Sequence, residues 1–359
     1  MLLLISWRRS LIVLAGLVAL GGLAASGCND RALPELAQTI APGSASAGQR
    51  DYLFCLWNVE NLFDDKDDNR TGPGDKEYDD LYPRRPDLLR LKLAKLTEAL
   101  LAMNRGKGPD ILAIVEVESL RAAQLLQQAL NASITDPALR YEHVLMKEIS
   151  VGRHIAPAII TRLPIIGDRT RNFGSRFRIV EGHILVDGQE LIVLASHWTS
   201  RLREGNDKGR AEYADKLYGA ANAMHKSNPA ADILICGDFN DTPHDVSVAN
   251  HLHGTNDARA VRGGPSLQLL NLLGDKNATA GFGTHYYGRW FIFDQILVSP
   301  GMLDGAGWSC EPGSVRTVNT LAKPGDRNQR PWRFGSENDT AARGYSDHFP
   351  VTVQLTVHR

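Results

Sequence analysis

The sequence predicts an α/β protein with mixed β-sheets, and three observations carry that expectation. Short apolar runs typical of buried strands alternate along the chain with longer stretches of helical composition. One apolar run contains Asp187-Gly188, a dipeptide favoured in tight hairpin turns, so at least one pair of strands is antiparallel. No second linker or repeat interrupts the pattern after residue 50, which predicts a single domain over residues 51–359.

The strands are expected where β-branched and aromatic residues concentrate. They are Leu53–Val59, Ile111–Val115, Ile155–Ile160, Ile184–Ala195 (with the hairpin turn inside it), Ile233–Cys236, Phe291–Val298 and Val351–Val357. Helices are expected between them where good helix formers dominate. They are Leu88–Met103, Leu120–Leu130 and Asp207–His225, and Ser119 is a suitable N-cap for the second.

The stretch Asp64–Pro86 is expected to be an exposed acidic loop. Residues 64–80 hold eight acidic residues against three basic ones. An EF-hand calcium loop is not expected, because Arg70 stands where that loop needs glycine and Lys76 where it needs a bidentate acid.

The first 27 residues have the pattern of a secretory signal peptide. Arg8 and Arg9 precede an apolar run, Leu11–Leu23, that is shorter than the roughly 20 residues needed to span a bilayer. The small residues before Cys28 resemble the lipobox of bacterial lipoproteins, which implies cleavage before Cys28 and a lipid anchor on its sulfur. Ala25 stands where that motif usually has leucine, so cleavage by ordinary signal peptidase stays open, with an uncleaved anchor as the remaining alternative.

The sequence therefore predicts an exported protein held in the bacterial cell envelope by a lipid at Cys28, or otherwise periplasmic or secreted. Residues 28–50, rich in Gly, Ser and Ala, are expected to be a flexible tether. The formal charge is −1, and without residues 1–27 it is −3, from 38 basic and 41 acidic residues. A strongly basic surface of the kind seen in tight nucleic-acid binders is excluded.

Four cysteines are few for an exported protein, so a disulfide-built scaffold is not expected. Cys55 and Cys236 lie inside apolar runs, where a free thiol packs as a small hydrophobe. A disulfide involving these two or Cys310 stays open. The cysteines show no zinc-binding spacing.

Polar side chains stand beside several of the expected strands. Two clusters, Gly237-Asp238-Phe239-Asn240 and Tyr345-Ser346-Asp347-His348, follow or precede apolar runs. Other strands carry Asn58, end in Glu116 or His197, or contain Asp294. Strand ends hold side chains on a rigid frame, and hard divalent cations together with phosphate chemistry need oxygen ligands and a proton-handling imidazole. The pattern predicts a metal-assisted site that cleaves phosphate esters.

Taken in order, these motifs resemble the endonuclease/exonuclease/phosphatase superfamily over roughly residues 52–357. That resemblance implies the DNase I-like fold, a four-layer α/β sandwich with two mixed β-sheets face to face and helices outside. It also implies roles at the matching positions. Glu116 is the expected ligand of Mg²⁺ or Mn²⁺ (Ca²⁺ being a further option), with Asn58 and Asp347 near the same ion. Asp238 is expected to orient or deprotonate the attacking water, with Asn240 helping to hold it or the phosphate.

The resemblance also implies that His197 and His348 contact the phosphate, and that Asp294 orients a histidine, expected to be His348. Arg153 is a candidate phosphate contact. Each residue alone has a plainer structural interpretation, and Glu118 competes with Glu116 as the ligand, but a buried Asp294 is costly unless it is paired. Val115 replaces a glutamine usual in the family, and Ala156 stands where an acid is frequent.

The substrate is less determined. The sequence Ile292-Phe293-Asp294-Gln295 lacks the signature of inositol phosphatases. A sphingomyelinase would need an exposed aromatic hairpin, and Trp290, Trp308 and Trp332 are expected to pack in the core instead. The segment Trp57–Asp64 resembles exported bacterial nuclease-like members, so a nuclease acting on DNA or RNA is expected. The alternatives are a phosphodiesterase or phosphatase for a lipid headgroup or small molecule, and an inactive binding module. No protein partner is implied.

Overall fold

The computed structural model describes residues 49–72, 74–149, 152–166, 171–201, 206–274, 282–335 and 340–359. Cys28, the predicted signal peptide and most of the predicted tether lie outside these ranges. The first strand begins at Gln49, two residues before the expected start of the domain. No helix in the described ranges combines the length and the apolar character needed to cross a bilayer.

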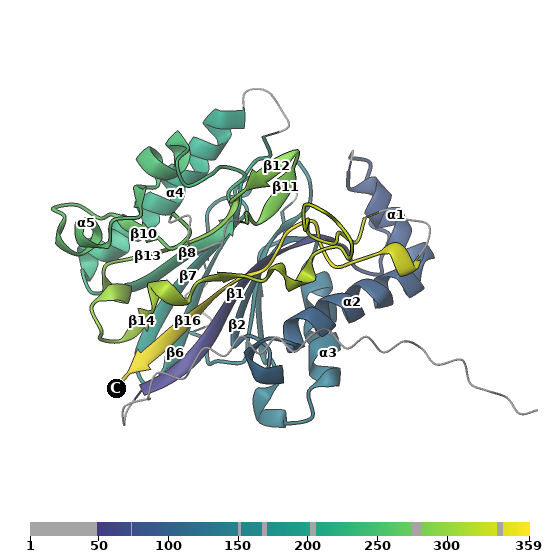
Figure 1. The fold of residues 1–359 in the computed structure, drawn as a ribbon, viewed down its shortest axis with the longest axis horizontal. Helices are drawn as coiled ribbons and strands as arrows, with labels where there is room; N and C mark the ends of the chain where they lie inside the picture. The colour runs from purple at the N-terminus through teal and green to yellow at the C-terminus, as the bar shows by residue number, and fades with distance from the viewer. Residues whose placement is uncertain are drawn as a thin grey trace, which may run out of the picture. The chain divides into compact units, whose positions relative to one another are not determined.

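Two sheets of seven strands form the centre of the fold (Figure 1). The first has the order β14-β16-β1-β2-β4-β3, with β15 pairing with β16. Its strands are β1 (Gln49–Leu62), β2 (Ile111–Val117), β3 (His143–Met146), β4 (Ala156–Thr161), β14 (Trp308–Cys310), β15 (Arg316–Thr317) and β16 (Val351–His358). β1 is parallel to β2 and antiparallel to β16, so the sheet is mixed, as predicted.

The second sheet has the order β5-β6-β7-β8-β13-β10-β9. Its strands are β5 (Arg171–Asn172), β6 (Ile179–Val186), β7 (Gln189–His197), β8 (Asp232–Asp238), β9 (Gly254–Thr255), β10 (Leu269–Asn271) and β13 (Asp294–Val298). β6 and β7 form the expected hairpin across Asp187-Gly188, and β7 is parallel to β8. A separate two-stranded hairpin consists of β11 (His285–Tyr287) and β12 (Arg289–Phe291).

Helices cover the outer face of each sheet (Figure 1). They are α1 (Lys76–Arg84), α2 (Pro86–Leu101), α3 (Leu120–Ser133) and α4 (Asn206–Ser227). A short further helix, α5 (Ala258–Gly263), instead packs through Val261 into the cluster between the two sheets. Ser119 caps α3 as predicted, because its side chain accepts a hydrogen bond from the Ala122 amide.

Three hydrophobic clusters separate these layers. Alternate residues of β1 point to opposite faces of the sheet. Cys55 and Trp57 pack toward α2 and α3, while Phe54 and Leu56 enter the cluster between the two sheets. A third cluster joins the outer face of β7 and β8 to α4, where Leu217 is fully buried. The result is the predicted four-layer α/β sandwich.

The expected exposed acidic loop is correct for residues 65–69, which are exposed and lie outside helices and strands, but it is wrong for much of the remaining stretch. Residues 76–84 form α1, and Asp64, Asp75 and Asp79 are buried. These carboxylates accept hydrogen bonds from backbone amides, as Asp79 does from Asp68 and Arg70. Arg70 also pairs with Glu118 at 2.7 Å. Composition alone suggested a solvated loop, but partners elsewhere in the chain satisfy these charges.

One further expectation changes, and one question that the sequence left open is answered. The predicted strand Phe291–Val298 is divided into two strands: β12 ends at Phe291, and β13 starts at Asp294. Between them, the amides of Phe293 and Asp294 donate hydrogen bonds to the Thr284 hydroxyl. Cys55, Cys236 and Cys310 are buried free thiols, so they form no disulfide with one another.

Candidate active site

The predicted site residues of the second sheet lie side by side at one edge. β7 and β8 run parallel and end together, which pairs His197 with Asp238 in register. β13 is antiparallel to β8 and begins at this edge, which pairs Asp294 with Asp238. Three side chains that are up to 97 positions apart in the sequence therefore occupy neighbouring positions on adjacent strands.

The first sheet contributes its residues to the same place. β1 and β2 are parallel, so Asn58 and Glu116 lie at their carboxyl ends, while β16 runs the other way and begins just after Asp347 and His348. The indole nitrogen of Trp57 donates to the His348 carbonyl oxygen at 2.9 Å, which fixes the loop before β16 against β1.

Irregular backbone shapes the edge of the first sheet. β2 has a register shift between Ile114 and Val117, and Glu116 within it has φ +66°. β1 has a comparable shift before Leu62, with Glu60 at φ +52°. Left-handed conformations at non-glycine residues cost about 1–3 kcal/mol each and concentrate at functional sites. The bulge turns the Glu116 carboxylate toward the site.

His348 is a buried, positively charged imidazole. Its Nδ1 lies 2.7 Å from Asp294 Oδ2, which is the contact the sequence predicted, and its Nε2 lies 3.8 Å from Asp238 Oδ2. Burial alone would lower the pKa of His348, but the two carboxylates outweigh it and hold the pKa well above the ordinary value. An imidazolium facing the site can donate a hydrogen bond to a phosphate oxygen.

His197 has the opposite electrostatic character. Burial lowers the pKa of its imidazole to about 3, against the opposing influence of Asp238, and Arg178 lowers it further. Its Nε2 lies 3.9 Å from Glu116 Oε1, and within the described chain its Nδ1 has no hydrogen-bond partner. The site thus holds one charged and one neutral histidine, an arrangement suited to distinct proton-handling roles.

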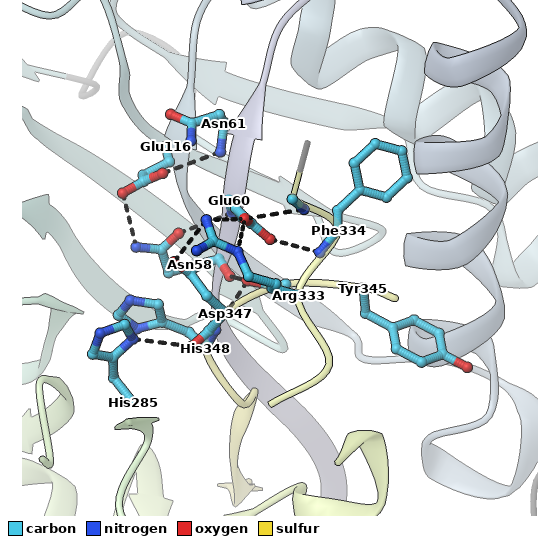
Figure 2. Close-up of polar contacts among 12 residues, drawn as sticks. Asn58, Glu60, Asn61, Glu116, His285, Arg333, Phe334, Tyr345, Asp347 and His348 are labelled. Carbon is cyan, nitrogen blue, oxygen red and sulfur yellow. Dashed lines mark hydrogen bonds and ion pairs between the residues drawn. The ribbon is translucent and has the colours of Figure 1, made fainter. Parts of the chain in front are cut away.

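The amide of Asn58 connects the carboxylates of Glu116 and Asp238. Its Nδ2 donates to Glu116 Oε1 at 3.2 Å (Figure 2). The same nitrogen donates to Asp238 Oδ2 at 3.0 Å. The side-chain Oδ1 of Asn58 accepts a hydrogen bond from the Glu60 amide, which directs the side-chain nitrogen toward Glu116 and Asp238. That Asn58 binds the metal stays a prediction. Glu116 Oε2 also accepts from the Asn61 amide at 3.1 Å.

Asn240 and Arg153 occupy supporting positions. The Asn240 amide donates to Asp238 Oδ1 at 2.9 Å, and its side chain donates to the Trp198 carbonyl oxygen, so Asn240 fixes the carboxylate of Asp238. The guanidinium of Arg153 pairs with Asp75 Oδ1 at 3.2 Å and also donates to Asn61. It lies close enough to His197 to influence its pKa, but it is held by these partners.

Sequence reasoning missed a second set of charges beside Asp347 (Figure 2). Arg333 pairs with Glu60 at 2.7 Å, and its Nη2 lies 3.8 Å from Asp347 Oδ2. Glu60 is buried and also accepts from the Phe334 and Gly335 amides. Lys92 is buried nearby, and desolvation lowers its pKa to about 8. Glu60 follows Asn58 by two positions and could have been suspected, but Arg333 and Lys92 carry no sequence signal.

His285 is the other residue that was missed. Its Nδ1 lies 2.9 Å from the Asp347 carbonyl oxygen, and its ring centroid lies 4.2 Å from that of His348. Figure 2 shows the two rings side by side. It follows no apolar strand, which is why the pattern that found the other residues did not find this one.

The described chain offers adjoining groups of possible metal ligands. The atoms of Glu116, His197 and Asp238 lie within 4.8 Å of one another, and the same limit holds for Asp238, Asp294 and His348, and for Asp347 with His285 and His348. Glu116 and Asp347 belong to different groups. The middle group, Asp238 with Asp294 and His348, shares Asp238 with the group of Glu116 and His348 with the group of Asp347. Glu118 belongs to the separate cluster with Arg70, so the geometry favours Glu116 over its competitor.

The fold and site define a DNase I-like α/β sandwich with a convergent acid and imidazole site. The sequence model of the Endonuclease/Exonuclease/phosphatase family matches residues 161–357, more than half of the chain, and the protein belongs to this family. It is therefore placed in a family of phosphoester hydrolases. The matched stretch includes His197, Asp238, Asp294 and His348. Glu116 lies outside it and is positioned by β2.

Solved structures support the fold at low sequence identity. An endonuclease/exonuclease/phosphatase family protein from Bacteroides thetaiotaomicron is 16% identical, with a TM-score of 0.52, covering 87% of this chain and 99% of that one. A mannosyl-6-phosphatase from the same species is 17% identical, with a TM-score of 0.50 and coverage of 85% and 99%. Truncated TDP2 from Caenorhabditis elegans is 15% identical, with a TM-score of 0.50 and coverage of 86% and 98%. No curated protein matches the chain.

Proposed function

We propose that the protein is a divalent-metal-dependent phosphodiesterase that hydrolyses phosphodiester bonds in nucleic acid. The observation that carries the proposal is the position of Asp238. Its carboxylate is buried, receives a hydrogen bond from Asn58, lies 3.8 Å from the imidazole of His348, and shares a group of possible metal ligands with Glu116. A base, a cation and a metal ligand therefore border one reacting centre.

A divalent cation fits the donor set. Glu116 is half-buried and Asp347 has 28% of its side chain exposed, so both carboxylates stay accessible to an ion that retains water. We assign Glu116 and Asp347 as the residues that hold Mg²⁺ or Mn²⁺, with Ca²⁺ as an alternative, and keep Asn58 as a further candidate. When bound, the ion supplies Lewis-acid stabilisation of charge on the phosphate oxygens.

Side chains of the protein carry out the proton transfer and stabilise the charge on the phosphate. Asp238 orients a water molecule and accepts its proton, since burial raises the pKa of this carboxyl and makes it a better base than an exposed aspartate. His348, charged and held by Asp294, donates to a phosphate oxygen as negative charge develops there. Neutral His197 donates a second hydrogen bond. Asn240 keeps Asp238 in place.

Nucleic acid is the proposed substrate because cationic groups border the site and the opening segment resembles nuclease-like proteins. Arg333 is more than half exposed beside Asp347, and Arg153 lies on the other side near Asn61. The alternative, a lipid headgroup or small phosphate ester, is favoured by an aromatic hairpin that the sequence did not predict. Trp290 lies in the β11–β12 hairpin with Tyr286, Tyr287 and Phe291, so an aromatic hairpin does border the site. Trp308 is fully buried, as expected.

The mature protein should be assayed with Mg²⁺, Mn²⁺ or Ca²⁺ on plasmid DNA, single-stranded DNA, RNA, sphingomyelin and bis-p-nitrophenyl phosphate. We expect nucleic-acid cleavage that EDTA stops, that added metal restores and that Asp238→Ala abolishes. Turnover of only sphingomyelin or bis-p-nitrophenyl phosphate would contradict a nuclease and support a phosphodiesterase for a lipid headgroup or small ester. No turnover with any metal would indicate a binding module.

We also propose that the protein is exported and attached to the cell envelope through a lipid at Cys28. Support comes from the signal-peptide pattern and the small residues before Cys28. In a bacterial host the full chain should fractionate with membranes, and Cys28→Ser should release it to the soluble fraction. Equal soluble recovery of both chains would contradict the anchor.

A further inference from the structure

The β11–β12 hairpin has two chemically different faces. Tyr286 is paired with Trp290 across the hairpin, and both point to one side, where Trp290 stacks on the buried ring of Phe349 at 5.8 Å. Side chains alternate along a strand, so the neighbouring residues point to the other side. Because the apolar rings of Tyr286 and Trp290 anchor the hairpin to the core, the opposite face is held in a fixed position.

That opposite face carries the two remaining cross-strand pairs. One is His285 with Phe291, and the other is Tyr287 with Arg289. Tyr287 is 70% exposed, the largest exposed fraction among the large hydrophobic residues in the described ranges. The Arg289 guanidinium lies 4.7 Å from the centre of the Phe291 ring, and Phe291 stacks in turn on Phe293 at 4.7 Å. The surface is therefore aromatic and cationic.

This face is continuous with the active site. His285 makes an isolated bridge with His348, and their rings lie 4.2 Å apart. Tyr287 follows His285 by two residues on the same face, a rise of about 7 Å along the strand. A group bound on Tyr287 would thus lie about two strand residues beyond the His285 ring that contacts His348.

We propose that the face formed by His285, Tyr287, Arg289 and Phe291 stacks a nucleobase adjacent to the scissile phosphate of single-stranded nucleic acid. The proposal rests on the nuclease function proposed above and specifies its substrate. A planar base matches an exposed phenol ring, and the adjacent phosphate matches the charge of Arg289. Bases in a duplex are already stacked on both sides, so an unpaired strand is the form that this surface fits.

A lipid bilayer fits the same surface less well. The hairpin turns at Gly288, where φ is +68°, and the residues next to the turn are one phenol and one exposed arginine. The larger apolar ring, Trp290, faces the core instead of the solvent. A membrane-inserting hairpin would need its aliphatic and indole groups at the tip.

Binding should be measured by fluorescence anisotropy, using Asp238→Ala chains loaded with Mg²⁺ so that the oligonucleotide is not cleaved. The probes are a labelled single-stranded DNA 12-mer and the same 12-mer with abasic residues. Adding Tyr287→Ala should weaken binding of the normal 12-mer by about 5- to 100-fold, the factor expected for one lost base stack. The abasic 12-mer should bind both chains equally, and the matched control Tyr287→Phe should bind the normal 12-mer as the parent does.

Three results would overturn the proposal. They are equal binding of the normal 12-mer by the Tyr287→Ala and parent chains, an equal loss on both probes, and Tyr287-dependent binding of phosphatidylcholine/phosphatidylglycerol vesicles without Tyr287-dependent binding of DNA. The cleavage assay on plasmid DNA, single-stranded DNA and RNA tests the nuclease separately, so a working nuclease with no role for Tyr287 is distinguishable from the absence of nuclease activity.

Discussion

The two sheets contribute unlike halves to the site. The second sheet supplies His197, Asp238 and Asp294 from regular strand ends in direct register, and all three are buried, Asp294 completely. The first sheet supplies Glu116 from a bulge and Asp347 from the loop before β16, and both remain partly exposed. One half is dry and regular, and the other is irregular and accessible to water.

This difference follows the chemistry proposed for each half. A proton acceptor such as Asp238 gains strength when water is excluded, because a lower dielectric strengthens its interactions with the reacting groups. His348, which approaches from the loop before β16, is buried against this half and benefits in the same way. A magnesium-type ion keeps several of its waters and needs open positions. Glu116 and Glu60, both with left-handed backbone, lie in the half proposed to hold the metal, and Asn240 beside Asp238 also has a positive φ of +52°. The predictions below test whether the two halves separate experimentally.

Replacing Asp238 should have the largest effect. Asp238→Ala removes the proposed base from the dry half, and we expect kcat/KM on the preferred substrate to fall by at least about 10³-fold, in the upper half of the range for a lost general base. The binding of metal, measured by calorimetry, should change little if the halves are separate. Abolished metal binding would instead make Asp238 a ligand.

Glu116→Gln should affect the other half. The neutral amide is a weaker ligand for a hard cation, so we expect a drop in activity of about 100-fold at limiting Mg²⁺ and partial recovery at high Mg²⁺. The matched control is Glu118→Gln, two residues along the same strand region, where the side chain pairs with Arg70 and the Asp64 amide. That variant should lose stability but keep the wild-type metal dependence. If the Glu116→Gln and Glu118→Gln variants showed the same metal dependence, Glu116 would not be the metal ligand.

Asp294→Asn should change the charge of His348. The carboxylate of Asp294 raises the pKa of His348, so in the wild type the imidazole stays protonated as the pH rises past its ordinary value. The variant loses one charge-assisted hydrogen bond, and we expect activity to fall about 10- to 150-fold at neutral pH. The loss should be smaller at lower pH, where His348 is protonated without help. A loss independent of pH would indicate a purely structural role for Asp294.

The dry half of the site was the more predictable one. The apolar runs that end in His197 and Asp238 predict their strands directly. A buried Asp294 was expected to need a charged or hydrogen-bonding partner, and in the structure that partner is His348. The other half depends on contacts between distant segments. The bulge at Glu116 and the pairing of Arg333 with Glu60 across 273 positions leave no periodic signal. The helix α1 was missed for a different reason, because its acidic composition favoured a loop although Tyr78, Leu81 and Tyr82 stand at helical spacing and pack against the core.

The smallest effect is expected at the other end of β8, where Asp232 is buried far from the chemistry. Burial raises the pKa of Asp232 to about 7, and its Oδ2 accepts a hydrogen bond from the Trp308 amide at 2.7 Å. Because the folded pKa lies above the unfolded one, this carboxyl contributes stability below about pH 4 that is lost as the pH rises through about 7. Asp232→Asn keeps an acceptor for Trp308 and removes the charge.

We therefore expect Asp232→Asn to be more stable than the wild type at pH 8 by about 1–2 kcal/mol, which corresponds to roughly 2–6 °C in Tm. The gain should shrink toward pH 4, and kcat/KM should stay unchanged, since this end of β8 does not reach the site. Differential scanning calorimetry at pH 4, 6 and 8 measures the trend. Asp232 and Asp238 are two buried carboxylates at opposite ends of β8. If Asp232→Asn lost activity as Asp238→Ala does, the site would depend on the whole strand and not on its carboxyl end alone.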